Sequence, residues 1–255
     1  MPTSTMKNKV RFEKAISIAF ALTVWQLLAT AIGKNILLVT PFEVMVRLAE
    51  LVVTKDFLAS VMFSFVRIVS GYLLALAAGS ALAALAGKHH MAEVLLWPFM
   101  TAIKSVPVAS FIILCLIWLS SGSLGIFISF LMVLPIIYTN MLHGIRSTDR
   151  NMLEMARIFN VTRLRRLKYI YLPQLKPYIV SACSVSIGLS WKAGIAAEVI
   201  GIPAGSIGER LYEAKIYLDS ADLFAWTAVI VAVSVLFEKL FLHLVKVSYA
   251  RLERT

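Results

Sequence analysis

Charged residues and cysteines are both scarce in this chain, and each scarcity narrows the class of protein. Only 15% of the 255 residues are Asp, Glu, Lys or Arg, whereas soluble domains carry about 25%. Mean hydropathy is +0.83, so a water-soluble monomer would precipitate and a polytopic membrane protein is predicted. The two cysteines, Cys115 and Cys183, lie in apolar runs. They are interpreted as small buried hydrophobic residues, not as a disulfide framework or metal site.

Motifs that carry chemistry are also missing. Gly87-Lys88 is not a phosphate loop, because the glycine expected five residues earlier is absent and His89 stands where Ser or Thr is required. His89 and His90 are interpreted as solvated loop residues. No catalytic triad, carboxylate pair or metal cluster appears at membrane depth. We therefore expect no enzyme activity, no metal and no cofactor in this chain, and any energy from ATP has to come through a partner.

The net charge of +11 first suggests a nucleic-acid partner. The basic residues, however, fall at the ends of hydrophobic runs, where they act as orientation signals in a membrane. This placement argues against nucleic acid.

The hydrophobic runs predict an all-α protein with six transmembrane helices, since a span needs about 20 mainly apolar residues. Residues 105–145 contain no Asp, Glu, Lys or Arg. One helix of that length would be about 60 Å long, twice the hydrocarbon thickness. The run must fold back, and Ser120-Ser121-Gly122-Ser123 supplies a turn. The predicted spans are 15–33, 68–87 (its helix beginning nearer Phe57), 94–119, 124–144, 177–197 and 223–247.

The distribution of Lys and Arg predicts the orientation of these spans. With a cytoplasmic N-terminus, sixteen of the 25 basic residues fall on the inside and five on the outside. The positive-inside rule then predicts cytoplasmic N- and C-termini. The expected organisation is a cytoplasmic segment 1–14, one transmembrane domain 15–250 with a cytoplasmic loop at about 146–173, and a cytoplasmic tail 251–255. Ala29-Thr30-Ala31 resembles a signal-peptidase site, but an uncleaved first span is favoured because a polytopic protein needs no removable signal.

Two segments are expected to be helices on the outer side. Thr40-Pro41-Phe42-Glu43 is typical of a helix start, with a capping box that opens an amphipathic helix over 41–53. Its apolar face is expected at Met45, Leu48, Ala49 and Val52. Residues 202–222 form either an amphipathic gate or docking helix, or an ordinary surface connection.

The second span carries a small residue at every fourth position. These residues are Gly71, Ala75, Gly79, Ala83 and Gly87. Such a stripe lets another transmembrane helix approach closely, so it predicts tight packing within the bundle and not a binding site.

The polar loop between the fourth and fifth spans predicts two short helices. Over 150–159, Met152, Met155 and Phe159 fall on one side. Asn160 tolerates the left-handed conformation that ends a helix. Thr162 can cap a second helix, with Leu164, Leu167 and Ile170 on one face, and Leu172-Pro173 is expected to stop that helix before the fifth span. The loop would then present an apolar knob of Met155, Ala156 and Phe159 beside one acid, Glu154. A basic helix lying on anionic lipid explains the arginines here, but not Glu154 or the spacing of the other positions.

This loop resembles the EAA loop of permease subunits in ATP-binding-cassette importers. The matching positions are Glu154-Met155-Ala156, then Asn160, then Ile170-x-Leu172-Pro173. Met155 stands where the first Ala is usual and Asn160 where Gly is usual, and both keep the geometry. Other positions over roughly 60–250 are similar to the permeases of nitrate, sulfonate, taurine and bicarbonate importers. They include Ser64-x-x-Arg67-x-x-x-Gly71, Pro107, Pro135, Ala197-Glu198-x-Ile200-Gly201 and Gly205-x-Ile207-Gly208.

This resemblance implies a type I importer permease in a bacterial inner membrane. Two permease copies, by default identical, would enclose the pathway, two cytoplasmic ATPase subunits would bind ATP and magnesium, and a substrate-binding protein would dock outside. The residues that it implies for ATPase coupling are Glu154, Met155, Ala156, Phe159, Asn160, Ile170, Leu172 and Pro173. The solute is expected to be a small anion, with a thiamine-precursor-like heterocycle as the alternative. A self-powered secondary transporter would need charged relays in several spans and inverted repeats, and neither is found.

Charged residues inside the spans are the remaining candidates for functional residues, because each charge is costly in a membrane and needs a reason to be there. Lys192, Glu198 and Lys104 are assigned to the substrate pathway. Alternatively, Lys192 pairs with a nearby acid or extends its ammonium group to the interface.

Overall fold

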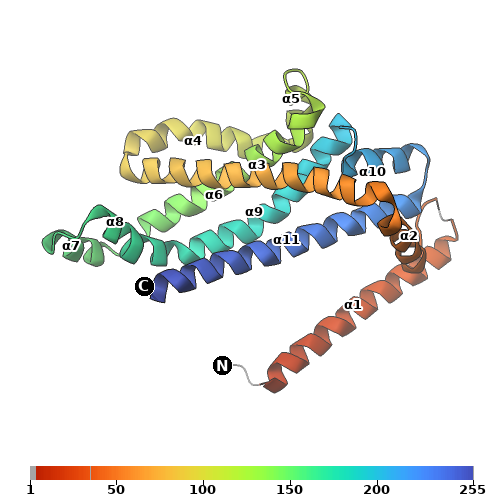
Figure 1. Ribbon diagram of the computed structural model, residues 1–255, viewed down its shortest axis with the longest axis horizontal. Coiled ribbons are helices and arrows are strands. Elements are labelled where there is room, and N and C mark those ends of the chain that lie inside the picture. Colours follow the sequence, from red (N-terminus) through yellow and green to blue (C-terminus); the bar gives the residue numbers. More distant parts are fainter. Residues whose placement is uncertain (1–3, 35, 255) are drawn as a thin grey trace. The chain divides into compact units, whose positions relative to one another are not determined.

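The computed structural model describes residues 4–34 and 36–254, with side chains described over 12–34 and 36–251 (Figure 1). Of the predicted cytoplasmic ends, residues 1–3 and 255 lie outside the described part. Every regular element in the described residues is helical. The chain divides into two compact units, one made of residues up to 59 with 210–229, the other of 60–209 with residues from 230 onward.

Five helical segments are long and apolar enough to cross a membrane, in agreement with five of the six predicted spans. They are Phe12–Ile32 within α1 (Ser4–Ile32), α3 (Lys55–Lys88), α6 (Ser121–Arg146), Arg163–Gly201, which includes α9 (Leu172–Gly201), and Ser220–Arg251 within α11 (Ser220–Arg254). The second span begins at Lys55, close to the expected start.

The predicted third span is not one straight helix. α4 (His90–Ser105) and α5 (Val108–Cys115) meet at a bend of 104°. Val106 at the bend is extended, with φ −79° and ψ 131°. Pro107 causes the break, because its ring disfavours helical geometry at the residue before it and it has no N–H to donate. A pair of apolar helices bent this sharply is either a broken span or a re-entrant loop.

The predicted turn at Ser120–Ser123 is also corrected. α6 begins at Ser121, and Ser120 is its N-cap. Leu119 N–H donates to the carbonyl of Cys115 at 2.8 Å, so the chain reverses just before the serines. Serine suits a helix start as well as a turn, and here the apolar run that follows extends the helix back to it.

The capping box before α2 (Pro41–Val53) is confirmed. Thr40 Oγ1 accepts from Glu43 N–H at 3.3 Å, and Thr40 N–H donates to Glu43 Oε2 at 3.1 Å. Val44 and Leu51 of this helix are buried, whereas Met45 and Val52 of the expected apolar face are exposed. That this exposed face lies on the bilayer stays a prediction.

An ion pair joins α2 to the first turn of α11 in the first unit. Arg47 Nε donates to Asp222 Oδ1 at 2.8 Å, and its Nη1 donates to Glu50 Oε2 at 2.9 Å. The hydrogen bond to Asp222, followed by that to Glu50, raises the pKa of Arg47 above its ordinary value. This guanidinium stays charged and ties the two helices together.

The segment expected to be a helix or a plain connection over 202–222 contains α10 (Ile207–Ile216). Two non-glycine residues flank it in the left-handed region, Ile202 with φ +47° and Leu218 with φ +55°. A β-branched residue there is strained, so surrounding contacts have to hold Ile202 in place.

The second unit is built around α6 and α9, which lie side by side (Figure 1). Its core includes Ile128, Met132 and Ala193, and the free Cys115 is buried there as predicted; Cys183 is buried too. The small-residue stripe of α3 packs on α6, as expected. A methyl group added to Gly71 would lie 2.2 Å from the carbonyl oxygen of Ile126, and one on Gly79 would lie 3.0 Å from Ile137.

Candidate functional site

The polar loop forms a compact elbow beyond the ends of α6 and α9, made of α7 (Arg150–Ile158), α8 (Arg163–Arg166) and the π-helical turn η1 (Leu167–Tyr171) (Figure 1). Asp149 starts it. The Asp149 carboxylate accepts from Asn151 N–H at 2.8 Å, and Asp149 N–H donates to Gln174 Oε1 at 2.9 Å. The first turn of the elbow is thus anchored to the first turn of α9.

Asn160 ends α7 in the conformation that the sequence predicts. Its φ is +50°, and two hydrogen bonds close the helix end: Val161 N–H to the carbonyl of Ala156 at 2.9 Å, and Asn160 N–H to the carbonyl of Arg157 at 3.1 Å. This pair of bonds is the Schellman motif, in which glycine is the usual residue. Arg166 Nε donates to the carbonyl of Val161 at 3.0 Å and holds the turn.

The predicted stop at Leu172-Pro173 is wrong. Helical structure runs from Arg163 to Gly201 without a gap. Leu172 N–H donates to the carbonyl of Leu167, five residues back, so the turn before Pro173 is widened. A wide turn accommodates a proline that has no N–H and whose ring would clash in a tighter helix. Thr162 occupies the N-cap position of α8, but its side chain makes no capping hydrogen bond.

The exposed apolar surface of the elbow does not coincide with the predicted knob, and it also includes Met152, Leu164, Leu167 and Tyr169. Met155 and Phe159 are exposed, Phe159 by 74%, but Ala156 is 0% exposed. Ala156 therefore packs inward and is not part of the exposed knob. Ile158, which is 76% exposed, takes its place on the surface. The spacing of Met155, Ile158 and Phe159, at i, i+3 and i+4, was the signal in the sequence that could have identified it.

Charge on the elbow is almost all positive. Glu154 is exposed, and no described residue pairs with it. Exposed arginines surround it in the sequence, at Arg150, Arg157, Arg163 and Arg165. Of the other positions of the motif, Ile170 is buried, and Leu172 and Pro173 are partly buried. An unpaired acid beside a bare apolar knob suits a partner that offers a groove and a cation.

Glu198 is buried and is not exposed to a pathway. Its side chain is 1% exposed, so a solute in an open pathway cannot touch it. Ser64 Oγ donates to Glu198 Oε2 at 2.6 Å, and Ser64 Oγ in turn accepts from Ile207 N–H at 2.9 Å. Gly208 N–H donates to Oε2 at 3.4 Å. The carboxylate joins α3, α9 and the first turn of α10 and is corrected to a structural role.

Lys192 is exposed on α9. It lines a shallow groove of about 290 Å³ with Trp191 and with Ile230, Val231 and Ser234 of α11. No described acid pairs with it. Lys104 is also exposed and lines a separate groove of about 270 Å³ between α4 and α6.

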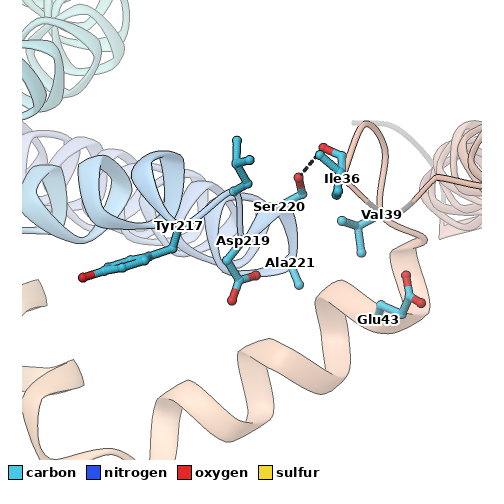
Figure 2. Close-up of a pocket in the computed structure, with 8 residues that line it drawn as sticks. Ile36, Val39, Glu43, Tyr217, Asp219, Ser220 and Ala221 are labelled. Atoms are coloured by element: carbon cyan, nitrogen blue, oxygen red, sulfur yellow. Dashed lines mark hydrogen bonds between the residues drawn. The ribbon is translucent and has the colours of Figure 1, made fainter.

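The first unit has a hollow of about 490 Å³ between the connection after α1 and the connection before α11 (Figure 2). Ser220 Oγ donates to the carbonyl of Ile36 at 2.6 Å and closes one side. Glu43 and Asp219 both line it. Two carboxylates make this hollow unsuitable for an anion.

The family model described as "Binding-protein-dependent transport system inner membrane component" matches residues 71–254, which include the whole elbow. This chain belongs to that family. It is a polytopic inner-membrane permease component, not an enzyme.

Relatives of the permease include a putative aliphatic sulfonates transport permease of Bacillus subtilis, 24% identical over 210 residues, covering 81% of this chain and 75% of the relative. A nitrate import permease of Leptolyngbya laminosa is 28% identical over 204 residues, covering 76% and 71%. A bicarbonate transport system permease of Synechococcus elongatus is 24% identical over 177 residues, covering 69% and 64%.

Sequence reasoning noted Ser64 and Arg67 in this permease only as matches to a pattern. In the structure, both residues make defined contacts. Arg67 packs over the ring of Phe63 with 3.6 Å from Cζ to the ring centroid, and its Nη2 would lie 3.1 Å from a methyl group on Gly122. No signal in the sequence pairs Ser64 with Glu198, because 134 residues separate them.

Proposed function

We propose that this permease is the transmembrane subunit of an ATP-driven importer that moves a small anion into the cytoplasm. The exposed knob of Met155, Ile158 and Phe159 beside the unpaired Glu154 carries the proposal, because such a surface on a membrane component needs a partner to cover it. The partner is a cytoplasmic ATPase subunit, which binds ATP and magnesium and receives one elbow. Glu154 meets a cation of that subunit while the knob fills its groove.

The assembly contains two copies of this chain, two ATPase subunits and a substrate-binding protein on the outer side. Both termini and the elbow are cytoplasmic, as the placement of basic residues favours. Closure of the ATPase pair on ATP draws the two elbows together. Since α8, η1 and α9 are continuous, each elbow moves its helix as a rigid body and alternates access to the pathway.

The anionic substrate class rests on the names of the relatives, which are permeases for sulfonates, nitrate and bicarbonate. Lys192 supports it, since its ammonium lies exposed within a span and no described acid neutralises it. An intramembrane cation is favoured where an anion or water passes.

Co-purification with the ATPase subunit tests the proposal. Glu154→Arg is expected to release the ATPase or abolish its stimulation by substrate-loaded binding protein, because it places a cation against a cation. Glu13→Arg is the matched control, an exposed glutamate on α1 outside the elbow, and should retain the ATPase. Solute uptake by vesicles that hold the permease alone would contradict the proposal.

A further inference from the structure

The groove between α4 and α6 holds polar and charged groups along its whole length. One end lies where Arg146 closes α6, just before the elbow, and Arg146 donates there to the carboxylate of Glu93. The other end is at Lys104, eleven residues beyond Glu93 on α4, which corresponds to about 16 Å along a helix. The groove therefore extends from the elbow side along most of α4.

The charges in this groove leave one cation without a counterion. Glu93 is neutralised by Arg146, and His90 Nδ1 lies 3.4 Å from the same carboxylate. Lys104 has no ion pair or hydrogen bond with any described residue. With histidine neutral, the lining groups Lys104, Arg146 and Glu93 sum to a formal charge of +1. An ammonium within a transmembrane segment is costly unless a partner comes to it.

Tyr138 supplies a second unpaired group on the α6 side of the groove. The residue is only 4% exposed, and its hydroxyl has no hydrogen-bond partner among the described residues. Buried polar groups are almost always hydrogen-bonded. Tyr138 and Lys104 line the same groove, and a phenol O–H and an ammonium are both donors, which suit the oxygen atoms of an anion.

We propose that the groove between α4 and α6 binds a small oxyanion, with Lys104 and Tyr138 as its donors, and is the site that the solute occupies before release on the elbow side. This inference rests on the proposed function and extends it to a second location, since no residue of the groove is shared with the one beside Lys192. The volume of about 270 Å³ accommodates a sulfonate, nitrate or bicarbonate ion with water. The occupant is a soluble anion and not a lipid headgroup, because Lys104 lies about 16 Å beyond the Glu93 end that a headgroup would reach.

Trp97 lines the same groove and reports on it. The experiment titrates ethanesulfonate and bicarbonate into purified full-length permease in neutral detergent and follows tryptophan fluorescence, with Trp97→Phe as the blank. Nitrate quenches fluorescence by collision, so its binding is measured by calorimetry. At least one of the three anions is expected to give a saturable signal. Lys104→Met should weaken that binding about tenfold or more, and Tyr138→Phe about three- to tenfold.

Two further variants distinguish the loss of the binding site from misfolding of the permease. Lys104→Arg should keep affinity within about threefold, because the donor and the charge remain. Lys239→Met removes an exposed lysine from α11 outside the groove and should change nothing. A fluorescence or calorimetric signal that is absent for all three anions, or that survives Lys104→Met unchanged, overturns the proposal.

A parallel titration in lipid tests whether a lipid headgroup occupies the groove instead. The titration is repeated in bilayer discs of phosphatidylcholine alone and of phosphatidylcholine with phosphatidylglycerol. Equal binding of the soluble anion in both supports the proposal, whereas a Lys104-dependent signal produced by phosphatidylglycerol itself refutes it in favour of a headgroup site. None of these assays contains an ATPase. Loss of anion binding with intact ATPase retention therefore rejects only this inference, and the reverse result rejects only the coupling role of the elbow.

Discussion

Ser64 Oγ lies 2.6 Å from Oε2 of Glu198, although 134 residues separate the two along the chain. The same hydroxyl accepts from Ile207 N–H, so one serine connects α3 to α9 and to α10. A fully buried carboxylate survives in a membrane protein only with such partners. The contact places the strained connection at Ile202 between two anchored points, Glu198 and Ile207.

Ser64→Ala is therefore expected to destabilise the permease by about 2–3 kcal/mol, because it removes two hydrogen bonds and one of them is to a buried carboxylate. The midpoint of thermal unfolding in detergent should fall by several degrees. Ser70→Ala on the same helix is the control, since that hydroxyl bonds only the carbonyl of Val66 in its own helix. Equal midpoints for the two variants would show that the Glu198 contact contributes little.

The approach of α3 to α6 gives a second prediction. A methyl group on Gly71 would lie 2.2 Å from a backbone oxygen that cannot move alone, so Gly71→Ala should cost about 1–3 kcal/mol and lower the thermal midpoint. Gly188→Ala on α9 is the matched control, because nothing lies within 4 Å of its added methyl group. Gly188→Ala should be neutral or slightly stabilising. If Gly71→Ala is as stable as Gly188→Ala, the two helices do not pack as described.

The end of α7 gives a third prediction. Asn160→Gly should be tolerated, since glycine adopts a positive φ without strain. Asn160→Val should cost about 1–2 kcal/mol and misplace the elbow, because a β-branched residue is disfavoured there. ATPase retention measures the effect: Asn160→Gly should match the unmodified chain, and Asn160→Val should lose most of the bound subunit. A fully coupled valine variant would show that the turn is not required.

Ile158 gives a fourth prediction, because the structure adds this residue to the exposed knob. Ile158→Glu should reduce ATPase retention as strongly as Phe159→Glu, since each places a charge in the groove of the partner. Val53→Glu is the control, an exposed valine at the end of α2, and should leave the ATPase bound. Retention by Ile158→Glu equal to that of the control would exclude Ile158 from the contact.

Lys192 gives a fifth prediction. Lys192→Met should lower uptake about tenfold or more at low solute concentration while the complex stays assembled, because it removes the cation that faces the groove on α9. Uptake into proteoliposomes that contain the whole complex measures this, with Lys239→Met as the charge-matched control. Identical uptake kinetics in the two variants would place Lys192 outside the pathway.

Local properties of the chain account for what was predicted correctly. Hydropathy located the spans, because each span needs its own run of apolar residues whatever its neighbours are. The capping box at Thr40 and the left-handed turn at Asn160 also depend only on a few adjacent residues. The stripe of small residues on α3 predicted close packing, but not that α6 is the partner.

Only the tertiary structure decided which side chains are buried and which distant groups meet. Ala156 and Ile158 are two residues apart on one short helix, and what packs against that helix determines that the first is hidden and the second exposed. Glu198 looked like a pathway charge in the sequence, because the sequence does not show that Ser64 lies beside it. The helix break at Pro107 and the continuous helix through Pro173 make the same point. A proline either breaks a helix or widens one of its turns, and the neighbouring contacts select between the two.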